Sequence, residues 1–448
     1  MKKNVNAEHK PIFCLKRIFV VIVVATLFAS AFAVSIAAFT ASAETTSNIL
    51  NFYVVAKPDF SGQGYDAFSP QTLVAQQGDQ VNLTIRNTGN QTFRLQMQSQ
   101  PAVTIQPGTQ NGTQITPTDT SVPIFTASNS GIFDFSTAEH PEMKGQLVVL
   151  PSDWASYSPA VQTRSFTQLI FPDFAGDGYD KYFPAVIVVN QGDTLNLTIR
   201  NTDDMTHGFA IAAYSIDAMA NPGQDLPDGS IAPVDTQVAP FVASAPGIFR
   251  FLCTVYCGRG HFEMIGFLVV LPTQGTSYRP MPVTMYSYLT IKPDFAGDGY
   301  DKYLPGVVFA NMNDLIYIKV RNTDTVAHGF GLPYFGLSNE SIAPATVNST
   351  GNVQPMDTYL PPFLASQAGI FEFFCTDNCG VGHDQMTGYL VVLPTQTAIT
   401  PSSSPPPSSP APISSVIFVG LAAALLTAGI LIGVVIVQKF TKEESPTA

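Results

Sequence analysis

The chain has 448 residues, of which 45% are apolar and only 12% are charged, and its formal net charge is −12. This length allows about three domains, and the acidic balance argues against nucleic acid and fits a basic soluble protein as partner. Of the five cysteines, Cys14 precedes the first apolar run and the other four lie in two short clusters, so no cysteine is left for structural disulfides elsewhere.

The first 43 residues have the layout of a secretory signal peptide or of a signal anchor. Residues 1–17 are basic, residues 18–40 form an apolar run, and residues 41–43 (Ala-Ser-Ala) offer a small-residue cleavage site. The run is also long enough to span a bilayer, so a cleaved signal, which we favour, and a retained anchor both remain open. Either one sends the following chain across the membrane, with the basic end inside.

The chain then repeats the same unit three times. The segment K-P-D-F-S-G-Q-G-Y-D at 57–66 returns in altered form at 171–180 and 292–301, which gives units of about 115 residues. Each unit continues with an alternating apolar segment ending in R-N-T, a G-I-F segment and a closing L-V-V-L-P segment. This alternation, with abundant turn residues and no helical periodicity, predicts half-buried strands. We therefore expect an all-β fold of three tandem sandwiches.

The repeat and the composition also predict the domain limits. We assign the three sandwich domains to residues 44–153, 154–275 and 276–398. A Pro/Ser-rich stalk (399–412), a transmembrane helix (413–437) and a cytoplasmic tail (438–448) follow. The Pro/Ser tract is typical of an extended stalk, and the apolar run after it carries no charge and precedes two lysines. The sequence thus predicts a cell-membrane protein whose three domains stand on the extracytoplasmic side.

Two clusters of sulfur and nitrogen ligands follow nearly the same pattern. They read C-T-V-Y-C-G-R-G-H-F-E-M at 253–264 and C-T-D-N-C-G-V-G-H-D-Q-M at 375–386, and an H-G-F segment upstream of each adds His207 and His328. Thiolate, imidazole and thioether form a soft ligand set that favours copper. One cysteine would suggest a mononuclear blue-copper site, whereas two thiolates on one loop can bridge a pair of ions.

The C-x3-C-x3-H-x2-M spacing with an upstream H-G-F resembles the CuA binuclear copper family. That family comprises subunit II of haem-copper cytochrome oxidases and the electron-entry domain of nitrous oxide reductase, and the resemblance covers residues 154–398. It implies two bridging cysteines per site, a histidine and a methionine at one copper, and a histidine and a main-chain carbonyl at the other. In the first cluster, the resemblance implies that Cys253 and Cys257 bridge the coppers, that His207 and Met264 bind one copper, and that His261 and the Val255 carbonyl bind the other. In the second cluster, the same roles fall to Cys375 and Cys379, to His328 and Met386, and to His383 and the Asp377 carbonyl.

The resemblance implies a fold, a cofactor and partners as well. The family is built on the cupredoxin Greek-key sandwich, and two binuclear CuA centres would hold about four copper ions per chain. The implied function is relay of single electrons from cytochrome c or a small blue-copper protein, as a subunit II-like component of a respiratory oxidase with a haem-copper catalytic subunit as partner. The alternative is a free-standing membrane-tethered electron carrier or copper-storage protein without an oxidase partner. In neither case does the chain carry a catalytic site of its own.

The first unit lacks the full motif. Alignment on R-N-T places Phe93 where the other units have histidine, and the loop F-S-T-A-E-H-P-E-M at 135–143 keeps His140 and Met143 but contains no cysteine. The loop is also shorter by five residues. We expect a relic site, and hence a spacer or docking domain; a weak mononuclear copper site at His140 and Met143 is the alternative.

Other readings of the two clusters remain open at this stage. Each cysteine pair could form a disulfide in an oxidising compartment, and two cysteines with two histidines could hold structural zinc, although neither reading uses the methionines. Multicopper oxidases need H-x-H pairs, and no two histidines here lie two residues apart. The oxidase family carries a glutamate between its cysteines, where this chain has Val255 or Asp377, and Trp154 lies outside any aromatic electron-entry cluster. These departures bear on the partner more than on the copper site.

Overall fold

A computed structural model describes residues 48–60, 65–173, 176, 178–295, 297 and 299–396. The expected all-β fold is confirmed there, because every regular element is a strand or a single 3-10 turn. In these segments we find no helix with the length and apolarity needed to cross a bilayer. The predicted signal or anchor, the stalk, the transmembrane helix and the tail all lie outside the described residues.

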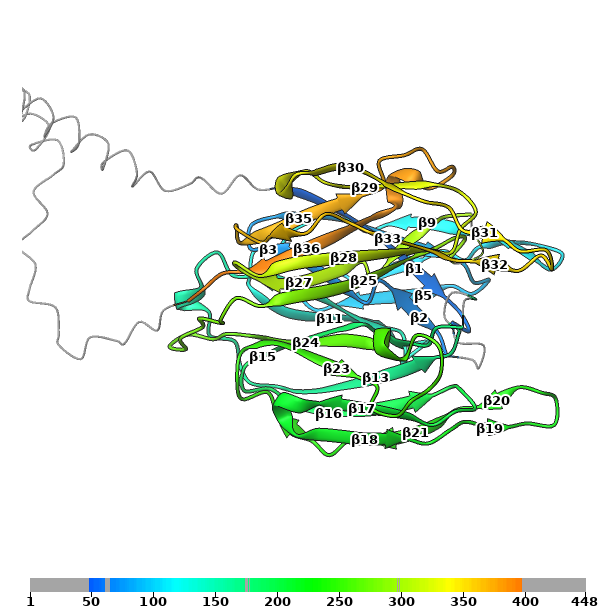
Figure 1. The fold of residues 1–448 in the computed structure, drawn as a ribbon. Coiled ribbons are helices and arrows are strands. Elements are labelled where there is room, and N and C mark those ends of the chain that lie inside the picture. Colours follow the sequence, from blue (N-terminus) through cyan, green and yellow to red (C-terminus); the bar gives the residue numbers. More distant parts are fainter. Residues whose placement is uncertain are drawn as a thin grey trace, which may run out of the picture. The chain divides into compact units, whose positions relative to one another are not determined.

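The strands form three repeating pairs of sheets, one pair for each sequence repeat (Figure 1). The first sandwich contains β1 (Ile49–Lys57), β2 (Ala67–Ser69), β3 (Thr72–Gln76), β4 (Gln80–Asn87), β5 (Phe93–Met97), β6 (Val103–Ile105), β7 (Thr109–Asn111), β8 (Gln114–Thr116), β9 (Thr118–Ser121), β10 (Phe125–Thr126), β11 (Gly131–Thr137) and β12 (Lys144–Leu150). The second contains β13 (Thr163–Phe171), β14 (Lys181–Phe183), β15 (Val186–Asn190), β16 (Thr194–Asn201), β17 (His207–Ile211), β18 (Ile216–Ala220), β19 (Gln224–Asp225), β20 (Ile231–Ala232), β21 (Val234–Gln237), β22 (Phe241–Val242), β23 (Gly247–Leu252) and β24 (Ile265–Leu271).

The third sandwich has the same plan. It contains β25 (Thr284–Lys292), β26 (Lys302–Leu304), β27 (Val307–Asn311), β28 (Leu315–Asn322), β29 (His328–Leu332), β30 (Leu337–Ile342), β31 (Thr346–Val347), β32 (Val353–Gln354), β33 (Met356–Tyr359), β34 (Phe363–Leu364), β35 (Gly369–Phe374) and β36 (Thr387–Leu393). The 3-10 turns are η1 (Trp154–Ser156), η2 (Ala212–Tyr214), η3 (His261–Glu263), η4 (Pro333–Phe335) and η5 (His383–Gln385).

Equivalent strands pair in the same order in all three sandwiches. In the second, one sheet runs β14-β13-β16-β21 with β22 also on β16, and the other runs β15-β24-β23-β17-β18. In the third, the corresponding orders are β26-β25-β28-β33, with β34 on β28, and β27-β36-β35-β29-β30. The metal-ligand clusters therefore occupy equivalent places, since each follows the third strand of the second sheet.

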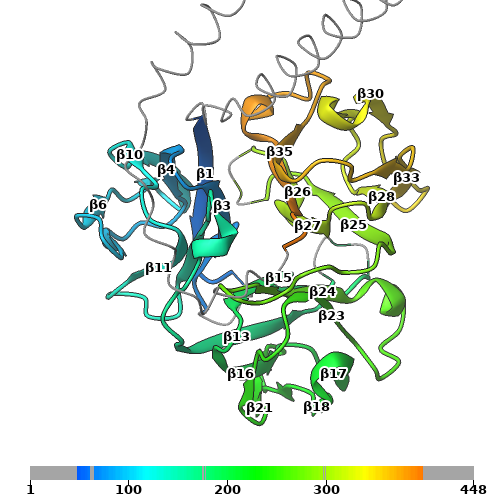
Figure 2. The ribbon, with the colours of Figure 1, turned by 90° about the vertical axis from the view of Figure 1, so that its left-hand side faces the viewer.

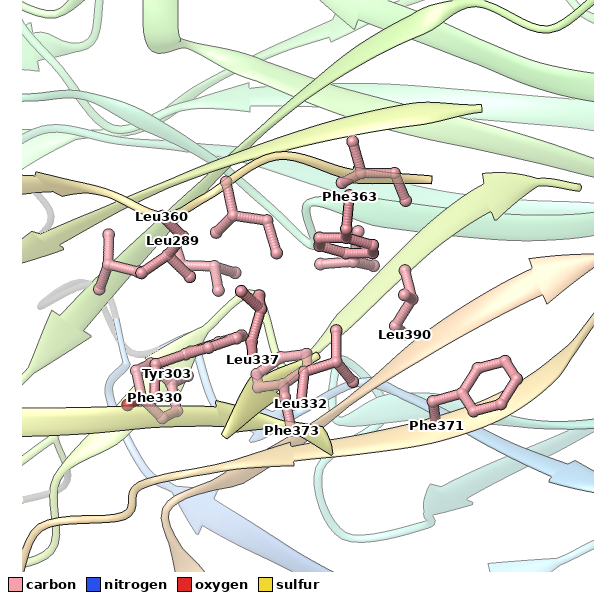
Figure 3. Close-up of a cluster of buried hydrophobic side chains, with 14 of the residues drawn as sticks. Leu289, Tyr303, Phe330, Leu332, Leu337, Leu360, Phe363, Phe371, Phe373 and Leu390 are labelled. Atoms are coloured by element: carbon pink, nitrogen blue, oxygen red, sulfur yellow. The ribbon is translucent and has the colours of Figure 1, made fainter. Parts of the chain in front are cut away.

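Strict alternation explains why the segments before R-N-T form strands. In β4 the side chains of Val81, Leu83 and Ile85 are fully buried, while the residues between them are partly exposed. Period-two alternation places one face of a strand on the core and the other toward solvent. In the third sandwich the core includes Tyr303 and Phe330, and Figure 3 shows their rings beside the surrounding leucine side chains.

The three sandwiches also share apolar cores. The repeated K-P-D-F segment contributes to one of them, where the ring of Phe60 lies 4.5 Å from that of Phe183 and 5.8 Å from that of Phe295. These three rings come from the first, second and third sandwiches, which in Figure 2 are coloured blue to teal, teal to green, and yellow-green to orange. Because their cores merge, the three sandwiches form one compact unit, and the domain limits given above stay predictions.

Two of the repeated segments, R-N-T and G-Y-D, also make a ring of contacts between the sandwiches. The R-N-T arginine of each sandwich lies over the tyrosine of a G-Y-D segment in another one. Arg321 of the third is 3.7 Å from the ring centre of Tyr179 in the second, and Arg86 of the first is 4.0 Å from that of Tyr300 in the third. Arg200 of the second lies 5.5 Å from the ring of the first sandwich's G-Y-D tyrosine. Cation–π contacts of this kind contribute about 0.5–2 kcal/mol each.

Candidate metal centres

The sheets place the ligands of the first cluster at strand ends. The loop leaves β23 at Cys253 and enters β24 directly after Met264, and the Cys253 N–H donates to the Met264 carbonyl at 3.2 Å across the base of the loop. His207 is the first residue of β17, which pairs with β23 through Ala210 and Leu252. The upstream histidine is therefore held beside the loop by the sheet, far from the loop in sequence.

The two thiols and two imidazoles of this cluster face one another. The Sγ atoms of Cys253 and Cys257 are 3.8 Å apart. Nδ1 of His207 lies 3.9 Å from the first sulfur, and Nδ1 of His261 lies 3.5 Å from the second. Both cysteines and His207 are buried. Each histidine thus presents the same ring nitrogen to a pair of sulfurs that share one small space.

The remaining two predicted donors of the first centre also lie in contact with the thiols. The fully buried Met264 has its Sδ 3.9 Å from Sγ of Cys257, and the carbonyl oxygen of Val255 lies 3.0 Å from Sγ of Cys253. The structure therefore brings together all six positions that the sequence suggested for this site.

The second centre repeats this arrangement to within 0.2 Å. The upstream histidine again begins a strand, β29, and the cysteine loop again joins β35 to β36. The Sγ of Cys375 lies 3.8 Å from that of Cys379, 3.9 Å from Nδ1 of His328 and 3.2 Å from the carbonyl oxygen of Asp377. The Sγ of Cys379 lies 3.6 Å from Nδ1 of His383 and 3.9 Å from Sδ of Met386.

The donor sets fit a pair of soft ions. A disulfide needs a sulfur–sulfur distance of about 2.05 Å, so the 3.8 Å separations exclude one in either cluster of this structure. Metal–thiolate bonds measure about 2.3 Å, which lets two sulfurs 3.8 Å apart share two ions between them. Structural zinc would need only the cysteines and histidines. The buried thioether against Cys257 favours copper, because thioether sulfur is a soft ligand.

A carboxylate orients each upstream histidine, and these two residues were not singled out from the sequence. Oδ2 of Asp203 lies 2.8 Å from Nε2 of His207, and Oδ2 of Asp324 lies 3.2 Å from Nε2 of His328. Such a partner fixes the ring and leaves Nδ1 to face the metal. The signal was present in the sequence, because both carboxylates directly follow R-N-T, where the first unit has Gly89.

The glycine of each H-G-F segment lets the cysteine loop approach the strand. The Gly208 N–H donates to Sγ of Cys253 at 3.4 Å, and a Cβ at this position would stand 2.7 Å from the Thr254 amide nitrogen. Gly329 donates in the same way to Cys375, at 3.5 Å. Amide donors directed at a sulfur stabilise its thiolate form.

In each centre the surrounding groups lower the pKa of the first cysteine, which favours its thiolate form. Its hydrogen bond with Cys257 lowers the pKa of Cys253 to about 3, and the contact with His207 acts in the same direction. The same hydrogen bond raises the pKa of Cys257. Burial lowers the pKa of His207, but the contacts with Asp203 and Cys253 outweigh it and raise the pKa to about 9.

In the second centre the pKa of the first cysteine is again lowered and that of the second is again raised, by smaller amounts. Burial raises the pKa of Cys375, but hydrogen bonds from His328 and the Gly329 amide lower it to about 7. Burial and the nearby Cys375 raise the pKa of Cys379 to about 12. Since metal ligation requires thiolates, loading of either centre has to release the proton of the second cysteine.

In the first sandwich the structure places different groups at the corresponding positions. The ring of Phe93, which replaces the upstream histidine, meets His140 edge-on at 6.1 Å. Nδ1 of His140 lies 2.6 Å from a carboxylate oxygen of Asp66, and Met143 is buried. No soft binuclear site is possible here, because this unit contains no cysteine.

Comparison with known proteins gives partial sequence matches to two kinds of copper protein. No protein-family model matches the chain. Over 87 residues it is 32% identical to the nitrous-oxide reductase of Stutzerimonas stutzeri, which corresponds to 19% of this chain and 12% of that one. Over 89 residues it is 30% identical to cytochrome c oxidase subunit 2 of Thermus thermophilus, or 20% of this chain and 57% of that one. The chain thus spans only a small part of the nitrous-oxide reductases that it matches.

Solved structures match over a longer stretch but with low scores. A copper-containing nitrite reductase from Thermus scotoductus is 15% identical and covers 78% of this chain and 99% of its own, with a TM-score of 0.20. A multi-copper oxidase from Pseudomonas thermotolerans is 12% identical and covers 78% and 100%, with a TM-score of 0.23. Scores of this size carry no conclusion about function.

These findings define the class of protein. The chain has an all-β fold of three repeating sheet pairs, and about a fifth of it is similar in sequence to nitrous-oxide reductase and cytochrome c oxidase subunit 2. Two His-Cys-Cys groups, each with a methionine beside the second cysteine, resemble CuA motifs. The protein therefore carries two CuA-like metal sites, suited to copper, on tandem β-sandwiches.

Proposed function

We propose that this protein relays single electrons through two binuclear CuA-type copper centres, with about four copper ions per chain. The observation that carries the proposal is the pair of sulfurs 3.8 Å apart with a histidine Nδ1 beside each of them, found twice in one chain. Copper pairs held in this way would accept and release one electron while keeping the same ligands. As an electron-entry component, the chain would feed a haem-copper oxidase subunit.

The chain's own residues keep the ligands in place during electron transfer. In the first centre His207 and Met264 would serve one ion, and His261 and the carbonyl of Val255 the other. His207 is fixed by β17 and by its carboxylate partner, and Met264 is buried where β24 begins. Ligands held by strands and buried side chains move little, which lowers the rearrangement that accompanies electron gain or loss.

The rims of the two centres differ, which supports exchange with different redox partners. Beside the first centre, Tyr256 and Phe262 are 73% and 81% exposed, with their rings 5.6 and 5.1 Å from that of His261. At the equivalent positions of the second centre stand the exposed polar residues Asn378 and Asp384. The aromatic rim fits a transient apolar contact with a soluble donor, and the polar rim, with the carboxylate of Asp384, fits a partner that presents a basic group.

Anchoring in the cell membrane, with the sandwiches on the extracytoplasmic side, forms part of the same proposal. It rests on the basic and apolar segments at the two ends of the sequence. Isolation in mild detergent tests the oxidase partner. Co-migration with a haem-bearing subunit supports it, whereas a haem-free product indicates a free-standing carrier or copper-storage protein.

Copper analysis and electron paramagnetic resonance of the purified full-length protein test the electron relay. We expect about four coppers per chain and a mixed-valence signal from two centres. Cys257→Ser should abolish one centre and spare the other, and Cys379→Ser should do the reverse. Bound zinc, or a protein that stays redox-silent after copper loading, would overturn the proposal.

A further inference from the structure

The first sandwich lacks the soft ligand set of the other two, but one histidine and two carboxylates lie close together around its equivalent loop. Nδ1 of His140 and carboxylate oxygens of Asp66 and Glu142 all lie within 4.8 Å of one another. We propose that these three residues form a mononuclear site for a divalent transition-metal ion, independent of the two CuA-like centres. This donor set differs from the pair of His140 and Met143 that the sequence alone suggested.

The three donors converge on one point. Nδ1 of His140 lies 2.6 Å from Oδ2 of Asp66 and 3.9 Å from Oε1 of Glu142. A cavity of about 170 Å³ adjoins two of the donors, Asp66 and His140, and Met143 also lines it. The side chains of the three donors are 13–26% exposed. A hydrated ion can therefore reach them, and the cavity leaves room for water at the open coordination positions.

The surrounding structure holds two of the donors ready. Oδ1 of Asp66 accepts the amide of Asp59 at 2.7 Å, which leaves Oδ2 to face the histidine. The main-chain amide of His140 donates to Oγ1 of Thr137 at 2.8 Å, and the Phe93 ring supports the imidazole edge-on. Phe93, which stands where the other two units have a histidine, thus packs against the ring of His140. Ligands fixed in this way lose little freedom on binding.

The ligand chemistry selects a borderline ion. One imidazole and two carboxylates suit Zn²⁺, Mn²⁺ or Cu²⁺ rather than cuprous ion, and Cu²⁺ binds most tightly in the general order of divalent affinities. The two carboxylates together carry a formal charge of −2 when ionised, which a divalent ion neutralises. Arg200 of the second sandwich also acts on Glu142, but its hydrogen-bonded partner is Asp235, at 2.8 and 3.0 Å.

Titration of the full-length protein with Cu²⁺ alone tests this site. We expect one copper per chain beyond those of the thiolate centres, with the axial resonance of a mononuclear cupric ion and no thiolate charge-transfer band beyond those of these centres. His140→Gln and Glu142→Gln should each remove this signal and leave the mixed-valence signal unchanged. Glu139→Gln is the matched control, because it neutralises an exposed neighbouring carboxylate outside the proposed donor set, and it should leave both signals intact.

The outcome is separable from that of the proposed function. A variant in which Cys253, Cys257, Cys375 and Cys379 are all replaced by serine should lose the mixed-valence signals and keep the mononuclear one. The inference fails if no mononuclear signal forms, or if the signal survives both His140→Gln and Glu142→Gln. It fails equally if Glu139→Gln removes the signal as completely as Glu142→Gln, since the ion would then be held by general surface charge.

Discussion

Replacing Asp203 by alanine should weaken copper binding at the first centre while leaving the second centre unchanged. The carboxylate accepts from Nε2 of His207 at 2.8 Å, in a site where the histidine ring is fully buried. A hydrogen bond to a charged group contributes about 1.5–3 kcal/mol. At 1.4 kcal/mol per tenfold change, its loss corresponds to roughly 10- to 150-fold weaker binding. The equivalent contact of Asp324 is longer, at 3.2 Å, so Asp324→Ala should fall near the lower end of that range.

Competition against a copper chelator, followed by the resonance signal of each centre, measures both affinities in one protein. Asp203→Asn keeps an acceptor without the charge and should fall between wild type and Asp203→Ala. The first sandwich carries glycine at the equivalent place, so the fold tolerates the loss of this side chain. Unchanged affinity at the first centre, or equal loss at both centres, would refute the positioning role of the carboxylate.

Three further changes test other parts of the structure. Lys319→Met leaves the part-buried Glu263 without its ion-pair partner, so we expect a loss of about 3 kcal/mol, the lower end for a buried pair, in urea denaturation of the metal-free protein. A change below about 0.5 kcal/mol would contradict this. Gly208→Ala places a Cβ 2.7 Å from the Thr254 amide nitrogen, so the first centre should lose its signal while the second keeps it, and an unaltered spectrum would show that the loop can yield. Phe262→Ser should slow electron exchange with a soluble donor without altering the spectrum, because the ring is 81% exposed; an equal rate would exclude this rim as the contact surface.

The repeated strands of the fold could be predicted from the sequence, but the packing of the sandwiches on one another could not. Alternation in segments such as 80–87 identifies a strand because period two is a local property. The R-N-T and G-Y-D segments were recognised only as repeats. Their role, in which Arg321 covers Tyr179 of the preceding sandwich, depends on contacts between residues 142 positions apart. Local patterns do not encode which sandwich a side chain will meet.

For the candidate centres, too, the sequence predicts the ligands that lie within one loop and misses the contacts that depend on the fold. Spacing within a loop, as from Cys253 to Met264, fixes a ligand set because the loop is short. The upstream histidine was placed by resemblance, and the structure supplies the physical reason through the pairing of β17 with β23. The carboxylate partner was missed, since an aspartate after R-N-T reads equally well as a turn residue. In the first sandwich, Asp66 reads as part of a turn as well, and only the fold brings it to His140.

The contact between the two sandwiches that carry the CuA-like centres contains a buried ion pair next to a ligand loop. Glu263, next to the ligand Met264, meets Lys319 of β28 at 2.5 Å, and the side chain of this lysine is only 7% exposed. The equivalent strand positions in the first and second sandwiches are occupied by threonine. Burying a lysine is costly unless it is paired, so this pair fixes the geometry of the interface, as the buried Arg164 does between the second and first sandwiches through its ion pair with Asp134 at 3.3 Å. The strand that carries Lys319 ends just before Asp324, so the same pair links the loop of one centre to the strand that leads to the other.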